Sequence, residues 1–261
     1  MSVLAVSGLG ISFGGVRAVT DVSFTVKVGE VFSVIGPNGA GKTTLFNLIS
    51  GIYGADTGRV MLHDQDVTGL PPETLARRGL SRTFQNLQIF FRMSAVENIM
   101  LGRHVHEEQN VWKHLLGLGS TSRQNRATKD HAMALLKRFK LDGMAEKSAG
   151  SLSYGVLKRL EIARALAAEP KVLLLDEPAA GCNPTETAEI DHLIVEVARS
   201  GVAVVLVEHD MKLVMAISDR VHVMAQGRTL MEGVPREVAN DPRVIEAYLG
   251  IGLPTSESLH A

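Results

Sequence analysis

Between an apolar run and a segment of helical periodicity lies the sequence Gly36-Pro37-Asn38-Gly39-Ala40-Gly41-Lys42-Thr43-Thr44. The apolar run, residues 31–35, is typical of a buried strand, and a helix is expected over about residues 42–50. Glycines at this spacing let successive backbone N–H groups curl around a phosphate, and the helix N-terminus adds a partial positive charge. We expect Lys42 to reach the outer phosphates of a nucleotide and the Thr43 hydroxyl to ligate Mg²⁺. Because the flanking strand and helix are both present, the pattern predicts nucleotide binding rather than a chance glycine loop.

A second apolar run, residues 172–175, ends in two acids, Asp176 and Glu177. A strand beside the phosphate-loop strand would deliver Asp176 to the water shell of Mg²⁺. Glu177 could then polarise the attacking water as a general base. Taken alone, an Asp-Glu pair followed by Pro178 fits the capping of the next helix equally well. Together with the phosphate loop, the pair predicts a metal ligand and a base.

The rest of the chain divides by periodicity into strand-rich and helical parts. Residues 3–26 alternate as an antiparallel β layer does, and the region from about 86 to 165 carries helical periodicity, which predicts an inserted helical subdomain. Within it, the polar segment 117–130 is expected to be an exposed loop or the tip of a helical hairpin. The later elements are expected as strands at 171–176 and 202–207, a helix at 185–199 between them, and terminal helices at 236–239 and 242–249. A strand–helix–strand order favours a parallel pairing of those two strands.

Bulk properties exclude several classes of function. The 261 residues carry a formal net charge of −1, so no basic field points to nucleic acid. The single cysteine, Cys182, allows no internal disulfide and fits a reducing compartment. We see no signal peptide at the start, and no apolar run approaches the ~18 residues of a spanning helix. Any link to a membrane is therefore expected to go through a partner protein.

The segment before the second strand reads Ser151-Leu152-Ser153-Tyr154-Gly155-Val156-Leu157-Lys158-Arg159-Leu160-Glu161-Ile162-Ala163-Arg164-Ala165-Leu166. It resembles the signature of the ABC ATPases, whose usual form is Leu-Ser-Gly-Gly-Gln followed by a basic, helical segment. In that family the signature serine and the helix N-terminus of one subunit close on the γ-phosphate held by the other subunit. The resemblance therefore implies that Ser153 and Gly155 contact the nucleotide of a second subunit, again through a helix N-terminus.

Four further features resemble landmarks of the same family, in the expected order along the chain. Gln85 stands where the family has a glutamine that contacts Mg²⁺ and water, and His209 where it has a histidine that contacts the γ-phosphate. Phe13 matches the aromatic residue that stacks on adenine, and residues 178–184 match the loop that crosses the dimer interface. The resemblance thus implies catalytic roles for Glu177, His209 and Gln85, and metal contacts for Gln85 in addition to Thr43 and Asp176.

The resemblance covers the chain from about residue 3 to 250 and implies an α/β fold. This fold has a P-loop NTPase core, whose mixed or parallel sheet carries helices, together with an antiparallel β subdomain and an inserted helical subdomain. One nucleotide-binding domain is expected over residues 3–250, with its helical subdomain at about 86–165 and a tail at 251–261. The implied cofactors are ATP and Mg²⁺.

A narrower resemblance rests on 83–86, 96–104, 160–164, 179–184 and 246–250. These segments look like the longer of the two ATPase subunits of branched-chain amino-acid importers. The implied partners are a second ATPase subunit, identical or different, integral membrane permeases and, indirectly, a periplasmic solute-binding protein, with no nucleic acid. The implied location is peripheral, on the cytoplasmic face of the inner or plasma membrane. Related systems for urea, amides or lipopolysaccharide export remain alternatives, as do a non-transport ABC ATPase and a nucleotide sensor without turnover.

One departure from the signature and one basic run stand outside these assignments. Val156 replaces the usual final glutamine, and we expect Val156→Gln to tighten ATP-driven dimerisation through one added hydrogen bond. Cys182, in the interface loop where leucine is usual, is expected to be a small apolar residue rather than a redox group. The basic residues Arg77, Arg78 and Arg82 are expected to form an ordinary solvated face.

Overall fold

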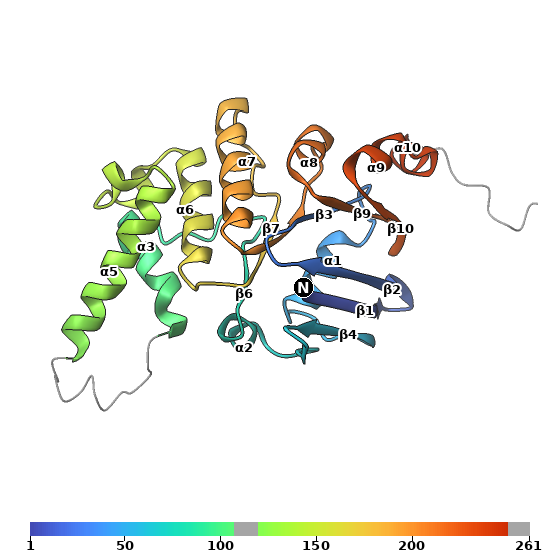
Figure 1. The fold of residues 1–261 in the computed structure, drawn as a ribbon, viewed down its shortest axis with the longest axis horizontal. Helices are drawn as coiled ribbons and strands as arrows, with labels where there is room; N and C mark the ends of the chain where they lie inside the picture. The colour runs from blue at the N-terminus through green and yellow to red at the C-terminus, as the bar shows by residue number, and fades with distance from the viewer. Residues whose placement is uncertain (107–119, 250–261) are drawn as a thin grey trace, which may run out of the picture. The chain divides into compact units, whose positions relative to one another are not determined.

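The computed structural model describes residues 1–106 and 120–249, which form two compact units. Among the described residues, unit 1 comprises 1–71 and 197–249, and unit 2 comprises 72–106 and 120–196. The predicted tail at 251–261 lies outside the described residues. Figure 1 labels most of the helices and strands of both units.

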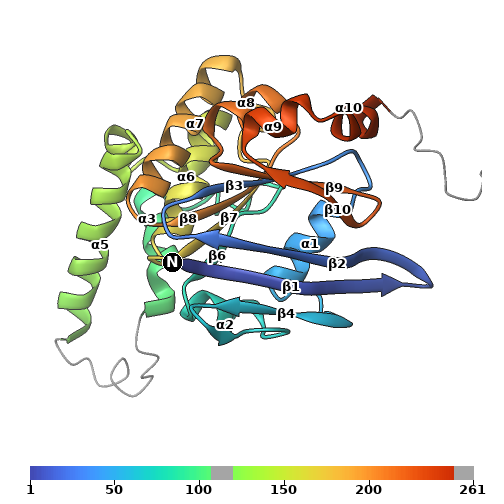
Figure 2. The same ribbon diagram turned by 45° about the vertical axis from the view of Figure 1, so that its right-hand side comes forward.

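Unit 1 begins with the predicted antiparallel layer, which the structure confirms. Its strand order is β2-β1-β4-β5, and Figure 2 shows the three long strands side by side. The strands are β1 (Ser2–Phe13), β2 (Val16–Lys27), β4 (Thr57–Leu62) and β5 (Gln65–Asp66). Along β2, buried Val22, Phe24 and Val26 alternate with exposed residues, as a strand with one covered face requires.

A second set of strands in unit 1 carries the phosphate loop. β3 lies between β8 and β9 and is parallel to both, while β10 pairs with β9 in the antiparallel sense. The strands are β3 (Val31–Ile35), β8 (Ala203–Val207), β9 (Arg220–Ala225) and β10 (Arg228–Gly233). Every residue of β3 and β8 is buried, which explains why both runs are apolar apart from Ser33, whose hydroxyl hydrogen-bonds that of Ser218.

The helices of unit 1 are α1 (Lys42–Ile49), α8 (Met211–Ile217), α9 (Pro235–Asn240) and α10 (Pro242–Leu249). The last two confirm the predicted terminal helices, and both begin with a proline, whose fixed φ suits the first turn. Val238 and Val244 pack in one apolar cluster with Ile35, the final residue of β3. The C-terminal helices therefore support the strand from which the phosphate loop emerges.

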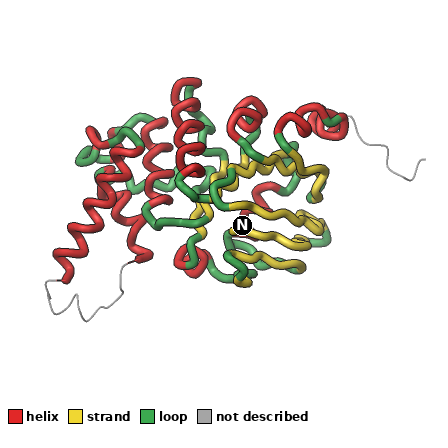
Figure 3. The backbone as a smooth tube through the Cα atoms, viewed as in Figure 1, coloured by secondary structure: helices red, strands yellow, loops and turns green. Residues whose placement is uncertain are grey.

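Unit 2 is mainly helical, as the red segments of Figure 3 show. Its two strands, β6 (Leu80–Arg82) and β7 (Val172–Asp176), pair in parallel. Its helices are α2 (Pro72–Arg77), α3 (Ala95–Gly102), η1 (Arg103–His106), α5 (Ser120–Arg138), η2 (Asp142–Met144), η3 (Ala149–Ser151), α6 (Tyr154–Leu166) and α7 (Pro184–Arg199), which ends in unit 1. No helix in the described residues is both long and apolar enough to cross a membrane.

One prediction for unit 2 is wrong in part. The polar segment 117–130 was expected to be a loop or a hairpin tip, whereas α5 begins at Ser120 and continues through it. The helix contains neither glycine nor proline, and basic, alanine and glutamine residues favour a helix even where they are solvated. Further along, Ala132, Leu136 and Phe139 are fully buried, so the predicted helical periodicity there is confirmed.

Candidate functional site

The phosphate loop owes its shape to glycines that no other residue could replace. Gly36 has φ 152°, and a Cβ atom there would lie 2.1 Å from the carbonyl oxygen of Met224. Gly41 has φ 96°, and its Cβ would lie 2.5 Å from the carbonyl oxygen of Ala18. Any side chain at these positions would push the loop off the strands beneath it. Packing within unit 1 therefore fixes Gly36 and Gly41, whereas Gly39 has open space around it and is favoured by its φ of 78°.

The N-terminus of α1 is free of competing acids. The N-cap residue is Gly41, which has no side chain to accept from the first N–H groups of the helix, and the first turn contains no acidic residue. The first N–H groups of a helix lack intrahelical acceptors, so this end favours an anion. Lys42 lies over the loop: its Nζ donates hydrogen bonds to the carbonyl oxygens of Gly36 (2.7 Å) and Pro37 (3.0 Å). Thr43 is exposed.

His209 comes to the same sheet edge as the phosphate loop. β3 and β8 are parallel with Val34 opposite Val207, and Gly36 and His209 each lie two residues beyond this pair, past the carboxyl ends of neighbouring strands. Ligands of open α/β sheets bind outside the carboxyl ends of the strands. The His209 side chain is 64% exposed and its backbone N–H donates to the buried Glu208 carboxylate.

Two aromatic residues of unit 1 form an exposed pair. The rings of Phe13 and Tyr53 meet edge to face with centroids 5.3 Å apart, and the residues are 47% and 38% exposed. Phe13 was predicted from the sequence, whereas Tyr53 was not. Tyr53 follows α1, the helix that begins at the phosphate loop, and this position in the sequence could have suggested that it lies near Phe13. The pair offers an apolar face on which a base can stack.

Tyr248 of α10 is a second contact of the loop that the sequence did not suggest. Burial raises the pKa of the Tyr248 hydroxyl, and a hydrogen bond with the backbone of Gly36 partly offsets that rise. Because Tyr248 and Gly36 are far apart in sequence, no local pattern could have linked them. Helix α10 therefore helps to hold the first residue of the phosphate loop.

In unit 2 the two predicted acids lie where β7 ends. The Asp176 residue is buried, and its Oδ2 lies 3.0 Å from Nη2 of Arg82. Burial raises the pKa of the Asp176 carboxyl, and the charge of Arg82 opposes the rise. The prediction that Arg82 belongs to a solvated face is wrong, because its side chain is only 7% exposed. Arg77 and Arg78 are exposed, as predicted.

Glu177 has an unusual backbone conformation. Its φ is 47°, in the left-handed region that residues other than glycine seldom adopt. Holding such a residue there costs roughly 1–3 kcal/mol of conformational energy. The side chain is partly exposed, and its Oε2 accepts a hydrogen bond of 3.1 Å from Nε2 of Gln85. Unit 2 thus brings together the predicted metal ligand, the predicted base and the predicted glutamine.

The signature segment begins helix α6. Ser153 is its N-cap, is exposed, and makes no capping hydrogen bond with its side chain, so the hydroxyl is not used by its own helix. Gly155, by contrast, is buried, and a Cβ there would lie 2.3 Å from the carboxylate of Glu186 on α7. Val156 is 7% exposed. Because Val156 is buried within unit 2, its position does not favour the added hydrogen bond that Val156→Gln was expected to make in the ATP-bound dimer.

Gly155→Ala should lower the free energy of unfolding by about 0.5–1.5 kcal/mol, the net worth of one hydrogen bond, because the flexible and partly exposed Glu186 side chain can move away from the new Cβ but gives up a hydrogen bond when it does. The displaced carboxylate also accepts from the backbone N–H of Asn183 just before α7. Urea denaturation of the variant measures the loss, and Gly155→Ala/Glu186→Ala should lose less than the sum of the two single variants. Unchanged stability of Gly155→Ala would show that α7 does not restrict this position.

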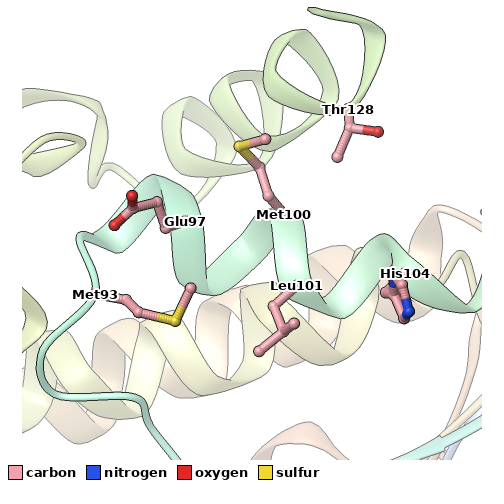
Figure 4. Close-up of a pocket in the computed structure, with 6 residues that line it drawn as sticks. All are labelled: Met93, Glu97, Met100, Leu101, His104 and Thr128. Atoms are coloured by element: carbon pink, nitrogen blue, oxygen red, sulfur yellow. The ribbon is translucent and has the colours of Figure 1, made fainter. Parts of the chain in front are cut away.

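Two cavities of unit 2 contain none of the functional-site residues predicted from the sequence. One, of about 220 Å³, is lined from α3, η1 and α5, and Figure 4 shows Met100 and His104 among its lining residues. Another, of about 300 Å³, lies along α7 and is lined partly by Arg159 and Glu189, whose side chains form an ion pair of 3.2 Å. Neither includes a residue of the phosphate loop or the two acids.

The donor set suits Mg²⁺, a hard cation that prefers oxygen ligands and keeps several waters. The described residues contain no group of three or more His, Cys, Asp or Glu side chains that could form a complete protein cage. A cation held by one carboxylate, waters and nucleotide phosphates needs no such cage. The buried Asp176 carboxylate already has a cationic partner in Arg82, which shows that its surroundings accept positive charge.

Comparisons with known proteins cover almost the whole chain. The model of the ABC transporter family matches residues 19–180, and that of the branched-chain amino acid ATP-binding cassette transporters matches residues 228–252. This chain is 44% identical to LivG of Escherichia coli K12 and 45% identical to BraF of Pseudomonas aeruginosa, both high-affinity branched-chain amino acid transport ATP-binding proteins. These alignments cover 95% of this chain and 97% and 98% of the relatives.

Two further comparisons extend the range. The lipopolysaccharide export system ATP-binding protein LptB of Escherichia coli K12 is 36% identical over 96% of this chain and 98% of its own. The ADP conformation of an ATP-binding cassette from an ABC transporter superposes with a TM-score of 0.83 at 32% identity, covering 96% of this chain and 99% of the other.

Proposed function

The chain belongs to the ABC transporter family of ATP-binding proteins, and from that premise we propose that it hydrolyses Mg·ATP to power uptake of branched-chain amino acids. Hydrolysis of ATP is the activity of this family, and the fold is that of its ATPase cassettes. The observation that supports the solute class is the match of residues 228–252 to the branched-chain amino acid cassette model, together with the full-length identity of 44% to LivG.

In this proposal unit 1 binds the nucleotide. The backbone N–H groups of residues 36–41 and the N-terminus of α1 surround the phosphates, and Lys42 leaves the carbonyl oxygens of its own loop to bind the outer ones. Phe13 stacks on the base. His209, at the same sheet edge, donates to the γ-phosphate. The exposure of both side chains supports these roles.

Unit 2 supplies the hydrolytic groups. Asp176, together with Thr43 of unit 1 and with Gln85, would hold Mg²⁺, which when bound neutralises charge on the phosphates. Glu177 accepts the proton of the attacking water, and Gln85 orients that carboxylate through the 3.1 Å hydrogen bond between them. The left-handed backbone of Glu177 fixes where its carboxylate points.

The assembly proposed is a pair of ATPase subunits bound to membrane permeases. The exposed Ser153 at the N-cap of α6 would contact the γ-phosphate held by the partner subunit, identical or different. Closure of the pair on ATP and its reopening after hydrolysis would switch the permeases between two states. The chain would lie peripherally on the cytoplasmic face of the membrane, and a periplasmic solute-binding protein would act through the permeases.

Uptake into proteoliposomes tests the solute class. The chain is reconstituted with its co-encoded second ATPase, permeases and solute-binding protein, and ATP-driven accumulation of labelled leucine, isoleucine and valine is compared with that of urea. We expect accumulation of the branched-chain amino acids alone. Preferential urea uptake, or no uptake despite ATP hydrolysis, would assign the chain to a related system.

Phe13→Ala tests the base-stacking role. Loss of one base–aromatic stack is worth roughly 1–3 kcal/mol, so the Kd for ATP should rise about fivefold or more. Tripolyphosphate, which has no base, should bind both proteins equally. Val16→Ala removes an exposed apolar side chain from the same hairpin and serves as the control. Calorimetric titration measures these affinities, and an unchanged ATP affinity in Phe13→Ala would exclude the stack.

A further inference from the structure

The ion pair between Arg82 and Asp176 is unusual for its burial. The two side chains are only 7% and 4% exposed. A carboxylate held out of water is costly unless a cation or hydrogen bonds compensate it, so one member cannot leave without a replacement. Any cation that Asp176 serves must therefore compete with Arg82.

The backbone around Arg82 holds the pair in place. β6 pairs with β7 so that Arg82 stands opposite Leu174, two residues before Asp176. The next residue, Thr83, donates its N–H to the Leu174 carbonyl oxygen, and its hydroxyl accepts from the Asp176 N–H. The guanidinium carbon also lies 5.1 Å from the centroid of the Phe84 ring. Arg82 is thus built into the strand pair and is not a surface side chain that reached the acid by chance.

We propose that Arg82 is a resident counter-cation that holds Asp176 in place in the metal-free protein and that a divalent cation must displace it from the carboxylate. This inference rests on the proposed role of Asp176 at the metal. Two cations on one carboxylate repel each other, so Arg82 lowers the affinity of the site for metal. Arg82 is therefore a positioning residue, which acts on the reaction only through Asp176.

The same segment also contacts the base. Three residues after Arg82, Gln85 donates to Glu177, so one short stretch of chain binds both neighbouring acids. When Arg82 withdraws from Asp176, the backbone and hydroxyl hydrogen bonds of Thr83 still hold this strand end against β7. Displacement of Arg82 therefore leaves the hydrogen bond from Gln85 to Glu177 in place.

Binding of Mn²⁺ at a saturating concentration of a hydrolysis-resistant ATP analogue tests the competition. Mn²⁺ takes the oxygen ligands that Mg²⁺ takes, and electron paramagnetic resonance counts the bound ion. Arg82→Met should bind Mn²⁺ about tenfold more tightly than wild type, the size of one charge-assisted hydrogen bond. The nucleotide affinity of Arg82→Met in EDTA should differ from that of wild type by less than about twofold. A merely structural role of Arg82 would not raise the affinity for Mn²⁺ while leaving the affinity for nucleotide unchanged. Arg77→Met removes an exposed arginine of the same unit and should behave as wild type.

Arg82→Lys keeps the charge and guards against a folding failure of Arg82→Met; its Mn²⁺ affinity should lie between those of wild type and Arg82→Met. In EDTA, Arg82→Met should melt at a lower temperature than wild type, and Arg82→Met/Asp176→Asn should recover part of the loss. Equal or weaker Mn²⁺ binding by Arg82→Met, or by Arg82→Lys if the former does not fold, would overturn the competition. Absence of nucleotide-dependent Mn²⁺ binding in wild type would instead refute the proposed function, and with it this inference.

Discussion

Glu177→Gln should retain ATP binding and lose about 10²-fold or more of steady-state turnover, because an amide cannot accept the proton of the attacking water. The substitution keeps the size of the side chain, and the amide oxygen can still accept the hydrogen bond that Gln85 now donates to the carboxylate. We therefore expect neither the fold nor the backbone of residue 177 to change. The closed ATP-bound pair should accumulate, since hydrolysis is the step that reopens it.

The matched control for this variant is Glu73→Gln, which removes one exposed acid from the first turn of α2. Phosphate release by the reconstituted complex and retention of labelled ATP are measured on both. Glu73→Gln should behave as wild type. Turnover by Glu177→Gln above about a tenth of wild type would show that another group is the base.

Lys42→Ala should weaken ATP binding by about tenfold or more, since a hydrogen bond to a charged group is worth about 1.5–3 kcal/mol. The Lys42 side chain is partly exposed and its ammonium donates to the carbonyl oxygens of Gly36 and Pro37, so the fold does not depend on its burial. The thermal midpoint without nucleotide should accordingly stay close to that of wild type.

Thr43→Ala separates the metal from the phosphates. This variant should lose affinity for Mg·ATP while its affinity for ATP in EDTA stays near that of wild type, because only the proposed metal ligand is removed. Calorimetric titration with and without Mg²⁺ distinguishes the two substitutions. A Lys42→Ala protein that binds Mg·ATP as tightly as wild type would refute the role given to the lysine.

Features written in contiguous sequence could be predicted. The phosphate loop, its flanking strand and helix, and the acids that end β7 each follow from a run of neighbouring residues, and the antiparallel layer follows from alternation. The helical segments could also be predicted from their periodicity, except in the polar segment 117–130, which was expected to be a loop or a hairpin tip. In α5 the residues from Ser120 onward are helical although most of them are polar, because helix propensity does not require an apolar face.

Features that depend on distant pairing could not be predicted. Arg82 reads as part of a basic run, and only the alignment of β6 with β7 brings it to an acid 94 positions later. Gly155 and Val156 belong to the signature segment but both are buried, and the Glu186 side chain of α7 lies against Gly155. Tyr248 meets Gly36 for a similar reason, because the C-terminal helices pack against the end of β3. In each case tertiary contacts decide which residues are buried.

Release of phosphate from labelled Mg·ATP by the reconstituted transporter is the most direct test that this chain is the motor of an amino-acid importer. We expect release that requires Mg²⁺, increases when the leucine-loaded solute-binding protein is added, and falls about 10²-fold or more when this chain carries Glu177→Gln. Phosphate release that is indifferent to Glu177→Gln, with ATP equally well bound by both proteins, would contradict it.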